Sequence, residues 1–362
     1  MKTIVFLINS LEGGGAERVI SYLANNMREV TVHLVVLDDK DQAYTLNESV
    51  QYHVLGISNF LKASYYFSKW LEKNAPESIV VSFLNRSNYV NLISGIFFSH
   101  VTLLSERNTV SKHFFNKGAF GIFNKLLIKI IYRFADKIIA VSSGVKKDLI
   151  ENYSCSPEIV SVINNPVDCE KINTLLDREP EIPNNIQNYV CSVGRLNKQK
   201  RFDVLIKAFA SVDTSLSLLI LGEGEERECL LNLISDLKLE KRVFLVGFKS
   251  NPYPYIKRAD IFVLPSDYEG FPNALLEALS IGKAVVSTDC ESGPRDILGC
   301  DQKFGLLVPT GDDNKMAEAI NRLNGDAKLK ECYESLASKR ISDNFNIDAI
   351  VVTYKKCFSE FL

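Results

Sequence analysis

The chain has 362 residues, 46% of them hydrophobic, and its 42 basic and 44 acidic residues leave a net charge of −2. This length suits two average domains, and the charge balance excludes a protein built as a whole to coat nucleic acid. No stretch reaches the roughly 20 apolar residues that span a bilayer, and the eight cysteines, which lack metal-ligand spacing, are typical of buried thiols in a reducing cytoplasm.

Short apolar, β-branched runs alternate with helical patterns along the chain, which is typical of parallel α/β sheets. In the first half, these runs predict strands at residues 3–8, 30–37, 78–83, 101–106 and 137–142. In the second half, they predict strands at residues 188–193, 216–221, 242–247, 260–265, 283–288 and 305–309. The polar segment 177–188, which contains Pro180 and Pro183, is predicted to link two doubly wound, Rossmann-like domains. We expect the domains to face each other across a cleft, because open α/β sheets bind ligands at the carboxyl ends of their strands.

Three consecutive glycines, Gly13 to Gly15, follow the first predicted strand and open a helix that begins near Ala16. Backbone N–H groups at such a helix start can meet a phosphate or a sugar hydroxyl. The spacing is not G-x-G-x-x-G, so a dinucleotide fingerprint is not supported. The alternative is a flexible turn that binds nothing.

Basic residues recur every four positions between residues 125 and 137, at Lys125, Lys129, Arg133 and Lys137. Apolar side chains cover much of the remaining surface of the helix that this spacing predicts. A basic amphipathic helix is typical of a segment that lies on an anionic membrane surface. The alternative is an ordinary helix with a solvated charged face.

Two cations and a glycine follow strands of the second half. Arg195 lies just past the strand at 188–193, and Lys200 lies five residues further on, before a helix. Arginine and lysine at the carboxyl end of a strand can neutralise a diphosphate; a solvated loop is the alternative. Gly222 ends the next strand, where a glycine allows close approach of the backbone.

The segment EGFPNALLE carries two glutamates, Glu269 and Glu277. Pro272 suits a first helical turn and Gly282 a helix end, which predicts a helix from about Phe271 to Ile281. Eight helical residues span roughly 12 Å, whereas glycosidase carboxylates lie about 5–9.5 Å apart, so a glycosidase pair is disfavoured. Neither glutamate has a histidine or aspartate at a metal-ligand spacing. A device that binds a polyhydroxyl ligand and a pair of ordinary surface glutamates both remain open.

These motifs together resemble the GT4 family of retaining, GT-B glycosyltransferases. EGFPNALLE is similar to the E-x7-E motif of that family, and FGLLVPTGD follows it in the family order. GGGAER near the start, NNPVD at 164–168 and VGRLNKQK at the second domain also match, so the resemblance covers nearly the whole chain. It implies an acceptor-binding domain at 1–176, a sugar-nucleotide-binding domain at 188–344 and a helix at 345–362 that packs back toward the first domain.

The resemblance also implies roles for individual residues. Arg195 and Lys200 would hold the donor diphosphate and stabilise the leaving group, Glu269 would face the donor sugar, and Glu277 would bind the ribose hydroxyls. The implied catalytic set is Arg195, Lys200 and Glu269. The implied donor-binding residues are Gly14, Gly15, Gly222, Gly270, Phe271, Asn273 and Glu277.

The mechanism implied by the family is transfer with retention at the anomeric carbon, through attack of the acceptor hydroxyl on the face that the diphosphate leaves. No side-chain nucleophile is then required, and catalysis consists of positioning and electrostatic stabilisation of the diphosphate. No D-x-D-like motif stands in a suitable place, so we expect no essential metal and no other cofactor.

Many relatives place a histidine at the end of the fourth strand of the first domain, where this chain has Ser105, Glu106, Arg107 and Asn108. We assign Glu106, Arg107 and Asn108 to the acceptor edge, with their individual roles open. GGxER together with SERN resembles the branch that adds hexose or N-acetylhexosamine to lipid-linked bacterial oligosaccharides and surface polysaccharides.

That branch implies a UDP-sugar donor, a glycan acceptor on a polyprenyl diphosphate and a cytoplasmic enzyme peripheral to the inner face of the membrane. Lys125, Lys129 and Arg133 would then contact anionic lipid. Two alternatives remain, which are a hexosamine epimerase of the same architecture and a non-catalytic subunit that binds a sugar nucleotide. The four histidines lie outside the motif context that the epimerase would need.

Overall fold

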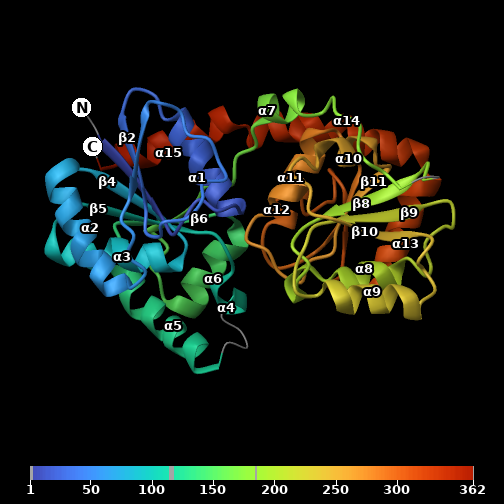
Figure 1. Ribbon diagram of the computed structural model, residues 1–362, viewed down its shortest axis with the longest axis horizontal. Coiled ribbons are helices and arrows are strands. Elements are labelled where there is room, and N and C mark those ends of the chain that lie inside the picture. Colours follow the sequence, from blue (N-terminus) through green and yellow to red (C-terminus); the bar gives the residue numbers. More distant parts are fainter. Residues whose placement is uncertain (1–2, 114–117, 184–185, 362) are drawn as a thin grey trace. The chain divides into compact units, whose positions relative to one another are not determined.

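The computed structural model describes residues 3–113, 118–183 and 186–361 (Figure 1). The chain folds into two compact units, with residues 1–166 and 347–362 in the first and residues 167–346 in the second. Each unit is a parallel sheet covered by helices, as the alternating apolar runs predict.

The sheet of the first unit has the strand order β3-β2-β1-β4-β5-β6-β7, and every pair of neighbours is parallel. Its strands are β1 Thr3–Ile8, β2 Thr31–Val36, β3 Val50–Val54, β4 Ile79–Phe83, β5 Val101–Glu106, β6 Lys137–Ala140 and β7 Val160–Val162. The central strands β1 and β4 are almost completely buried because helices cover both faces of the sheet. The sequence patterns did not predict β3 and β7. Both are edge strands with partly exposed side chains, so neither carries a continuous apolar run.

Helices cover both faces of this sheet. They are α1 Gly15–Asn26, α2 Phe60–Asn74, α3 Asn85–Phe97, α4 Val110–His113, α5 Gly118–Ile131, α6 Ser143–Tyr153 and α15 Ile347–Ser359, with a 3-10 turn η1 at Tyr132–Phe134. The last of them, α15, packs with α1 over one face and adds Ile350, Tyr354 and Phe358 to the core of the first unit. On the other face, Phe67 and Leu71 of α2 pack against Val5 and Leu7 of β1.

The second unit has the strand order β10-β9-β8-β11-β12-β13, again parallel throughout. Its strands are β8 Tyr189–Val193, β9 Ser217–Leu221, β10 Val243–Gly247, β11 Ile261–Leu264, β12 Val285–Thr288 and β13 Leu306–Val308, so all six predicted strands of this half are confirmed. Its helices are α7 Cys169–Thr174, α8 Phe202–Ala208, α9 Arg227–Asp236, α10 Tyr253–Arg258, α11 Asn273–Ser280, α12 Pro294–Leu298, α13 Asp313–Gly325 and α14 Ala327–Asn344, with a 3-10 turn η2 at Lys198–Lys200.

The chain enters and leaves the second unit at adjacent positions. Val167 N–H donates to the carbonyl of Phe345 over 2.7 Å, and Val167 also forms a parallel bridge with Asn346. The sequence places the end of the first domain at residue 176, whereas the structure begins the second unit at Val167. The segment 167–176, which contains α7, therefore belongs to the second unit. Residues 184–185 of the predicted linker 177–188 lie outside the described residues. Before them, Glu181 is attached to the second unit, because its N–H donates to the Tyr255 hydroxyl at 3.1 Å and its carboxylate pairs with Lys249 at 3.0 Å.

The predicted basic helix is shorter than the spacing of four suggests. Helix α5 ends at Ile131, Arg133 lies in η1, and Lys137 begins strand β6, where it pairs with Glu360 at 2.6 Å. Lys137 is therefore not part of a helical stripe, and that part of the prediction is wrong. Lys129 and Arg133 are exposed and Lys125 is half-buried. Nowhere in the described ranges does a helix combine the length and hydropathy that crossing a membrane requires.

Candidate functional site

The carboxyl ends of β8 and β9 meet with almost no space between their backbones. A side chain at Gly222 would place its Cβ 1.9 Å from the carbonyl oxygen of Gly194, and one at Gly224 would come within 2.2 Å of the carbonyl of Leu196. Gly222 also has a φ of +147°, which L side chains rarely adopt. Close packing between two loops of the protein thus accounts for this glycine, and its contact with a donor stays a prediction.

Gly222→Ala is expected to lower the free energy of unfolding by about 2 kcal/mol or more, because the methyl group must displace backbone. Gly56→Ala is a matched control, since Gly56 also has a positive φ of +67° but no atom of the described residues lies within 4 Å of a Cβ there. Urea denaturation monitored by circular dichroism measures both. Equal losses in the two variants would contradict a role for the Gly194 contact.

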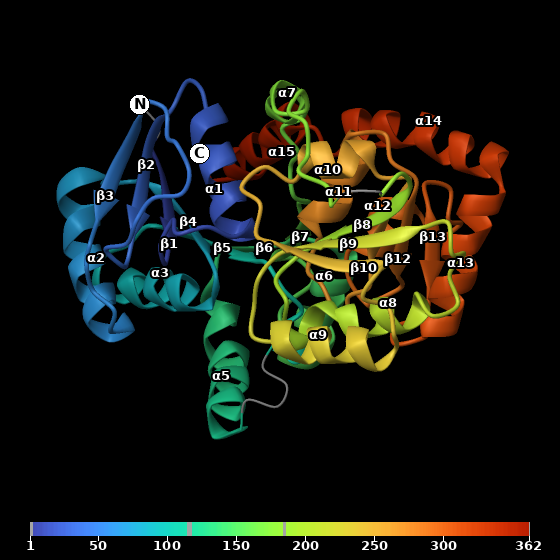
Figure 2. The same ribbon diagram turned by 45° about the vertical axis from the view of Figure 1, so that its right-hand side comes forward.

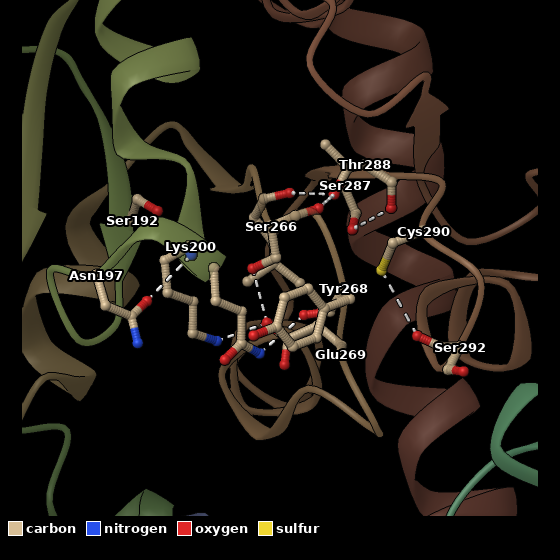
Figure 3. A network of polar contacts seen from close by, with 12 residues as sticks. Ser192, Asn197, Lys200, Ser266, Tyr268, Glu269, Ser287, Thr288, Cys290 and Ser292 are labelled. Atoms are coloured by element: carbon tan, nitrogen blue, oxygen red, sulfur yellow. Dashed lines mark hydrogen bonds and ion pairs between the residues drawn. The ribbon is translucent and has the colours of Figure 1, made fainter. Parts of the chain in front are cut away.

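Lys200 and Glu269, which the sequence assigns to one site, form an ion pair. Figure 3 shows the Lys200 ammonium directed at Glu269, with Nζ 2.5 Å from Oε1. Ser266 Oγ donates to the same oxygen at 2.7 Å, and the Ser266 carbonyl accepts from Thr288 Oγ1 at 2.5 Å. Glu269 is only 6% exposed. A buried carboxylate with a cation and a hydroxyl on one oxygen is held in a single orientation.

Further contacts fasten the loop after β8 to the loop after β11. Gln199 Nε2 donates to the carbonyl of Tyr268 at 2.8 Å, and Asp267 N–H donates to the carbonyl of Gln199 at 2.9 Å. Arg201, in a left-handed conformation with φ +47°, pairs with Asp267 at 2.9 Å. The sequence patterns did not single out these residues. Their only signal is that they follow strands that end at the same edge of the sheet.

Arg195 lies at this edge in a different state from Lys200. It directly follows Gly194 and is exposed, and within the described part of the chain its side chain has no hydrogen bond or ion pair. An anion at this edge can therefore recruit Arg195 without breaking an existing contact, whereas it must share Lys200 with Glu269.

Helix α11 carries the second glutamate. It begins at Asn273, two residues later than predicted, because Pro272 at its N-cap is extended with ψ 106°. Gly282, with φ +79°, follows its C-cap as predicted. Glu277 is 7% exposed in the middle of the helix. Glu269 lies before the helix, so helical rise does not set the separation of the two carboxylates, and the 12 Å estimate does not apply.

The turn that joins Glu269 to α11 is also tightly packed. A Cβ at Gly293, in the loop after β12, would lie 2.6 Å from Pro272 Cδ and 3.0 Å from the carbonyl oxygen of Gly270. Phe271 is buried and its ring centroid lies 5.5 Å from that of Phe345. These contacts restrain the backbone of the turn. The turn contains Gly270, Phe271 and Asn273, which the family resemblance implies as donor-binding residues.

Tyr44, which the sequence patterns did not indicate, hydrogen-bonds the glycine turn of residues 13–15 in the first unit. Helix α1 begins at Gly15, as predicted within one residue. The Tyr44 hydroxyl accepts from Gly14 N–H at 3.1 Å and donates to the Gly14 carbonyl at 2.9 Å. The Gly14 amide proposed for phosphate contact therefore already has a partner, which a ligand would have to displace.

The residues assigned to the acceptor edge lie at the end of β5, with Glu106 as its last residue and Arg107 and Asn108 just after it. Glu106 and Arg107 are buried, and Asn108 is half-buried. The Arg107 guanidinium hydrogen-bonds Asn165 and Ser105 and lies 5.1 Å from the ring centroid of Phe83. Burial lowers the pKa of Arg107.

The described residues contain no cluster of three histidine, cysteine, aspartate or glutamate side chains that could hold a metal ion. Burial, together with the charge of Glu269, raises the pKa of Cys290 to about 12, so this thiol stays neutral beside the site. The prediction that the cysteines are buried is wrong for Cys229, Cys300 and Cys332, which are exposed on surface helices and a turn.

Comparison with known families matches both halves of the chain. The family described as Glycosyltransferase Family 4 matches residues 13–171, and the family described as Glycosyl transferases group 1 matches residues 175–340. A Campylobacter jejuni protein named N-acetylgalactosamine-N,N'-diacetylbacillosaminyl-diphospho-undecaprenol 4-alpha-N-acetylgalactosaminyltransferase is 36% identical over 352 residues, which cover 94% of this chain and 95% of that protein. A lipopolysaccharide 1,6-galactosyltransferase of Salmonella typhimurium is 28% identical, over 90% of this chain and 91% of its own length.

Solved structures match over the whole length. A glycosyltransferase from Rickettsia africae superposes with a TM-score of 0.83 at 18% identity, over 99% of this chain and 98% of its own. The Anabaena protein HepE in complex with UDP gives a TM-score of 0.81 at 22% identity, over 99% and 100% of the two chains. At these identities the likeness shows a common fold.

Proposed function

Since this chain belongs to the family 4, group 1 glycosyltransferases and has their GT-B fold, we propose that it transfers a sugar from UDP to a lipid-linked glycan. The transferred sugar is a hexose or an N-acetylhexosamine, and its anomeric configuration is retained. The proposal rests on the arrangement of side chains at the carboxyl ends of β8 and β11. There Lys200 and Glu269 form an ion pair, and hydrogen bonds join the two loops that carry them. Arg195 lies in the same region, and its exposed side chain makes no hydrogen bond or ion pair with other described residues.

Two relatives support the choice of substrates. The Campylobacter protein is named for an acceptor on diphospho-undecaprenol, and its sequence aligns with nearly all of this chain. The Anabaena structure holds UDP in the same fold. A glycan on a polyprenyl diphosphate and a UDP-sugar are therefore the substrates that we propose here.

In the proposed reaction, the departing UDP gains charge that Arg195 and Lys200 neutralise. The Lys200–Glu269 pair fixes the lysine, so little reorganisation accompanies bond cleavage. Glu269 accepts hydrogen bonds from the donor sugar, and Glu277 accepts them from the ribose. The acceptor hydroxyl attacks the anomeric carbon, and its proton leaves with the diphosphate. No metal ion is assigned to any of these steps.

We further propose that α5 docks on an anionic bilayer. Figure 2 shows α5 projecting from the rest of the first unit. Its large apolar side chains face outward, with Ile122 at 71% exposure, and the exposed set is Phe120, Ile122, Phe123, Leu126, Ile130 and, in η1, Phe134. Basic side chains on the same segment complement anionic lipid head groups; they are Lys125 and Lys129 of α5 and Arg133 of η1. A patch of this kind on a monomer marks an interaction surface.

The proposal is tested by incubating the protein with a panel of UDP-, GDP- and TDP-sugars and a polyprenyl-diphosphate glycan. Release of nucleoside diphosphate identifies the donor, and NMR of the product gives its anomeric configuration. Release that requires the acceptor supports transfer. Epimerised sugar without an acceptor, or binding without turnover of any donor, would contradict it.

Glu277→Gln is expected to lower the affinity for UDP at least several-fold while the protein stays folded. In its proposed role, the Glu277 carboxylate accepts hydrogen bonds from the ribose, and such bonds to a charged group contribute about 1.5–3 kcal/mol each. Calorimetric titration measures the affinity. Glu331→Gln, at an exposed position of α14, is the matched control. Equal affinity in the two variants would remove Glu277 from the ribose site.

A further inference from the structure

Helix α5 and the turn η1 are attached to the rest of the first unit through a small set of buried side chains. Tyr132 in η1 is completely buried. Its hydroxyl accepts from Asn88 Nδ2 at 3.0 Å and donates to Glu106 Oε2 at 3.0 Å. One hydroxyl thus connects the end of the proposed lipid-binding segment to a residue of the acceptor edge.

Glu106 is only 2% exposed, and donors surround it. Oε2 accepts from Tyr132 and from Asn85 Nδ2 at 3.3 Å, and Oε1 accepts from Arg107 N–H at 3.2 Å. Donors of this kind favour the carboxylate, whereas burial favours the neutral acid. Burial dominates and raises the pKa of Glu106 to about 7, with Tyr132 among the groups that oppose the rise.

The charged and titratable groups that face Glu106 come from each element packed around it. They are Tyr132 of η1, Tyr89 of α3, Arg107 after β5, Asp148 and Tyr153 of α6, and Cys155 beyond α6. Asp148 raises the pKa further, since it is a second acid, and its own oxygens are taken by Ser111. Glu106 itself changes charge near neutral pH.

The raised pKa of Glu106 determines how pH affects the attachment of α5 and η1 to the rest of the unit. In the closed arrangement, α5 and η1 cover Glu106, and in the open arrangement they move away and expose it to water. Because burial raises its pKa, the carboxyl group binds its proton more tightly in the closed arrangement. The closed arrangement is therefore most favourable below the ordinary pKa of a glutamate, and its advantage is lost as pH rises through about 7. Ionisation of Glu106 favours release of the segment that covers it.

We propose that Tyr132 is a positioning residue that couples the lipid-facing helix α5 to the acceptor edge, through its hydrogen bond to the carboxyl group of Glu106. The attachment of α5 and the charge of Glu106 then depend on each other, and this dependence is reciprocal. The consequence for lipid-linked acceptors rests on the function proposed above; the coupling itself does not. Tyr132 touches no substrate in this scheme.

The chain offers a matched pair of variants. Tyr132→Phe removes a buried hydroxyl that binds Glu106, and Tyr89→Phe removes a buried hydroxyl that binds Asn124 of α5 at 2.9 Å. Both variants lose a hydrogen bond between α5–η1 and the rest of the unit, but only the first deprives the Glu106 carboxylate of one of its donors. Glu106→Gln provides a third variant that cannot ionise.

Hydrogen exchange of peptides from residues 118–134, corrected for the intrinsic pH dependence of exchange, tests the coupling without any substrate. In the unmodified protein, protection of α5 is expected to fall from about pH 4.5 upward and to level off above about pH 7. Tyr132→Phe moves the pH at which the fall levels off upward by about one unit, because the anion loses a donor. Tyr89→Phe keeps that pH unchanged, and Glu106→Gln abolishes the transition. An unmodified protein without a transition, or a fall that levels off at the same pH in the two tyrosine variants, would overturn the coupling.

Activity then tests the consequence. The KM for a polyprenyl-diphosphate glycan, divided by the KM for a water-soluble glycan with a short alkyl chain, is expected to rise several-fold over the pH range in which protection of α5 falls. In Tyr132→Phe, the pH at which this rise levels off moves upward in the same way. A ratio that ignores pH while exchange of α5 follows it would overturn the link to the acceptor. If no sugar nucleotide is turned over, the proposed function fails, and hydrogen exchange still decides the coupling.

Discussion

Arg195→Ala is expected to lower kcat by about 10²–10³-fold, the loss typical of removing one preorganised donor to charge that develops in the transition state. The melting temperature stays unchanged, because the exposed Arg195 side chain makes no hydrogen bond or ion pair with other described residues. A substitution of Lys200 is a less specific test of leaving-group stabilisation. It also removes the cation that pairs with the buried Glu269 carboxylate and so disturbs the stability of the site.

Steady-state kinetics with donor and acceptor both varied measure this effect. A residue that acts mainly on the leaving diphosphate changes kcat more than the KM for the acceptor. Lys198→Ala is the matched control, because Lys198 is an exposed cation three residues further along the same loop. Turnover of Arg195→Ala within twofold of the control would exclude Arg195 from the reaction.

The simultaneous change of Lys125, Lys129 and Arg133 to glutamate is expected to lower binding to anionic vesicles by about 100-fold or more. Each cation near such a surface contributes about 1 kcal/mol, so three lost attractions amount to about two orders of magnitude before the new repulsion is counted. The apolar side chains of α5 remain, so residual binding to neutral vesicles is retained.

Co-sedimentation with vesicles of phosphatidylglycerol and phosphatidylcholine measures this binding, and salt should weaken it in the unmodified protein. The control carries the same charge change at Lys241, Lys328 and Lys339, which are exposed positions of the second unit. Transfer to a water-soluble acceptor reports whether the active protein survives both changes. Sedimentation that is equal in the two triple variants would assign α5 an ordinary solvated face.

The buried strands could be predicted from sequence because their composition alone defines them. Strands β1, β4, β8 and β11 are covered on both faces, so nearly every residue in them is apolar. The edge strands β3 and β7 could not be predicted in this way, since their side chains are partly exposed. The error at Lys137 has a related cause: a spacing of four continued by chance from α5 through η1 into β6, and spacing alone does not show where a helix ends.

The candidate site was predictable only in part. The position of Arg195, Lys200 and Glu269 after strands that end at one sheet edge follows from topology, and the structure joins the last two directly. The contacts of Tyr44 with Gly14 and of Tyr132 with Glu106 join segments 30 and 26 residues apart. No local sequence pattern predicts such contacts, because they depend on which distant segments the tertiary fold brings together.

The return of α15 to the first unit has a consequence for synthesis on the ribosome. A nascent chain that has exposed residues 1–166 still lacks the side chains that complete its core, among them Ile350, Tyr354 and Phe358. The second unit, by contrast, is one continuous segment from 167 to 346, so all of its contacts become available before those of the first. The core of the first unit can therefore be completed only after the whole second unit has been synthesised, and until α15 emerges the surface that binds it remains open to chaperones.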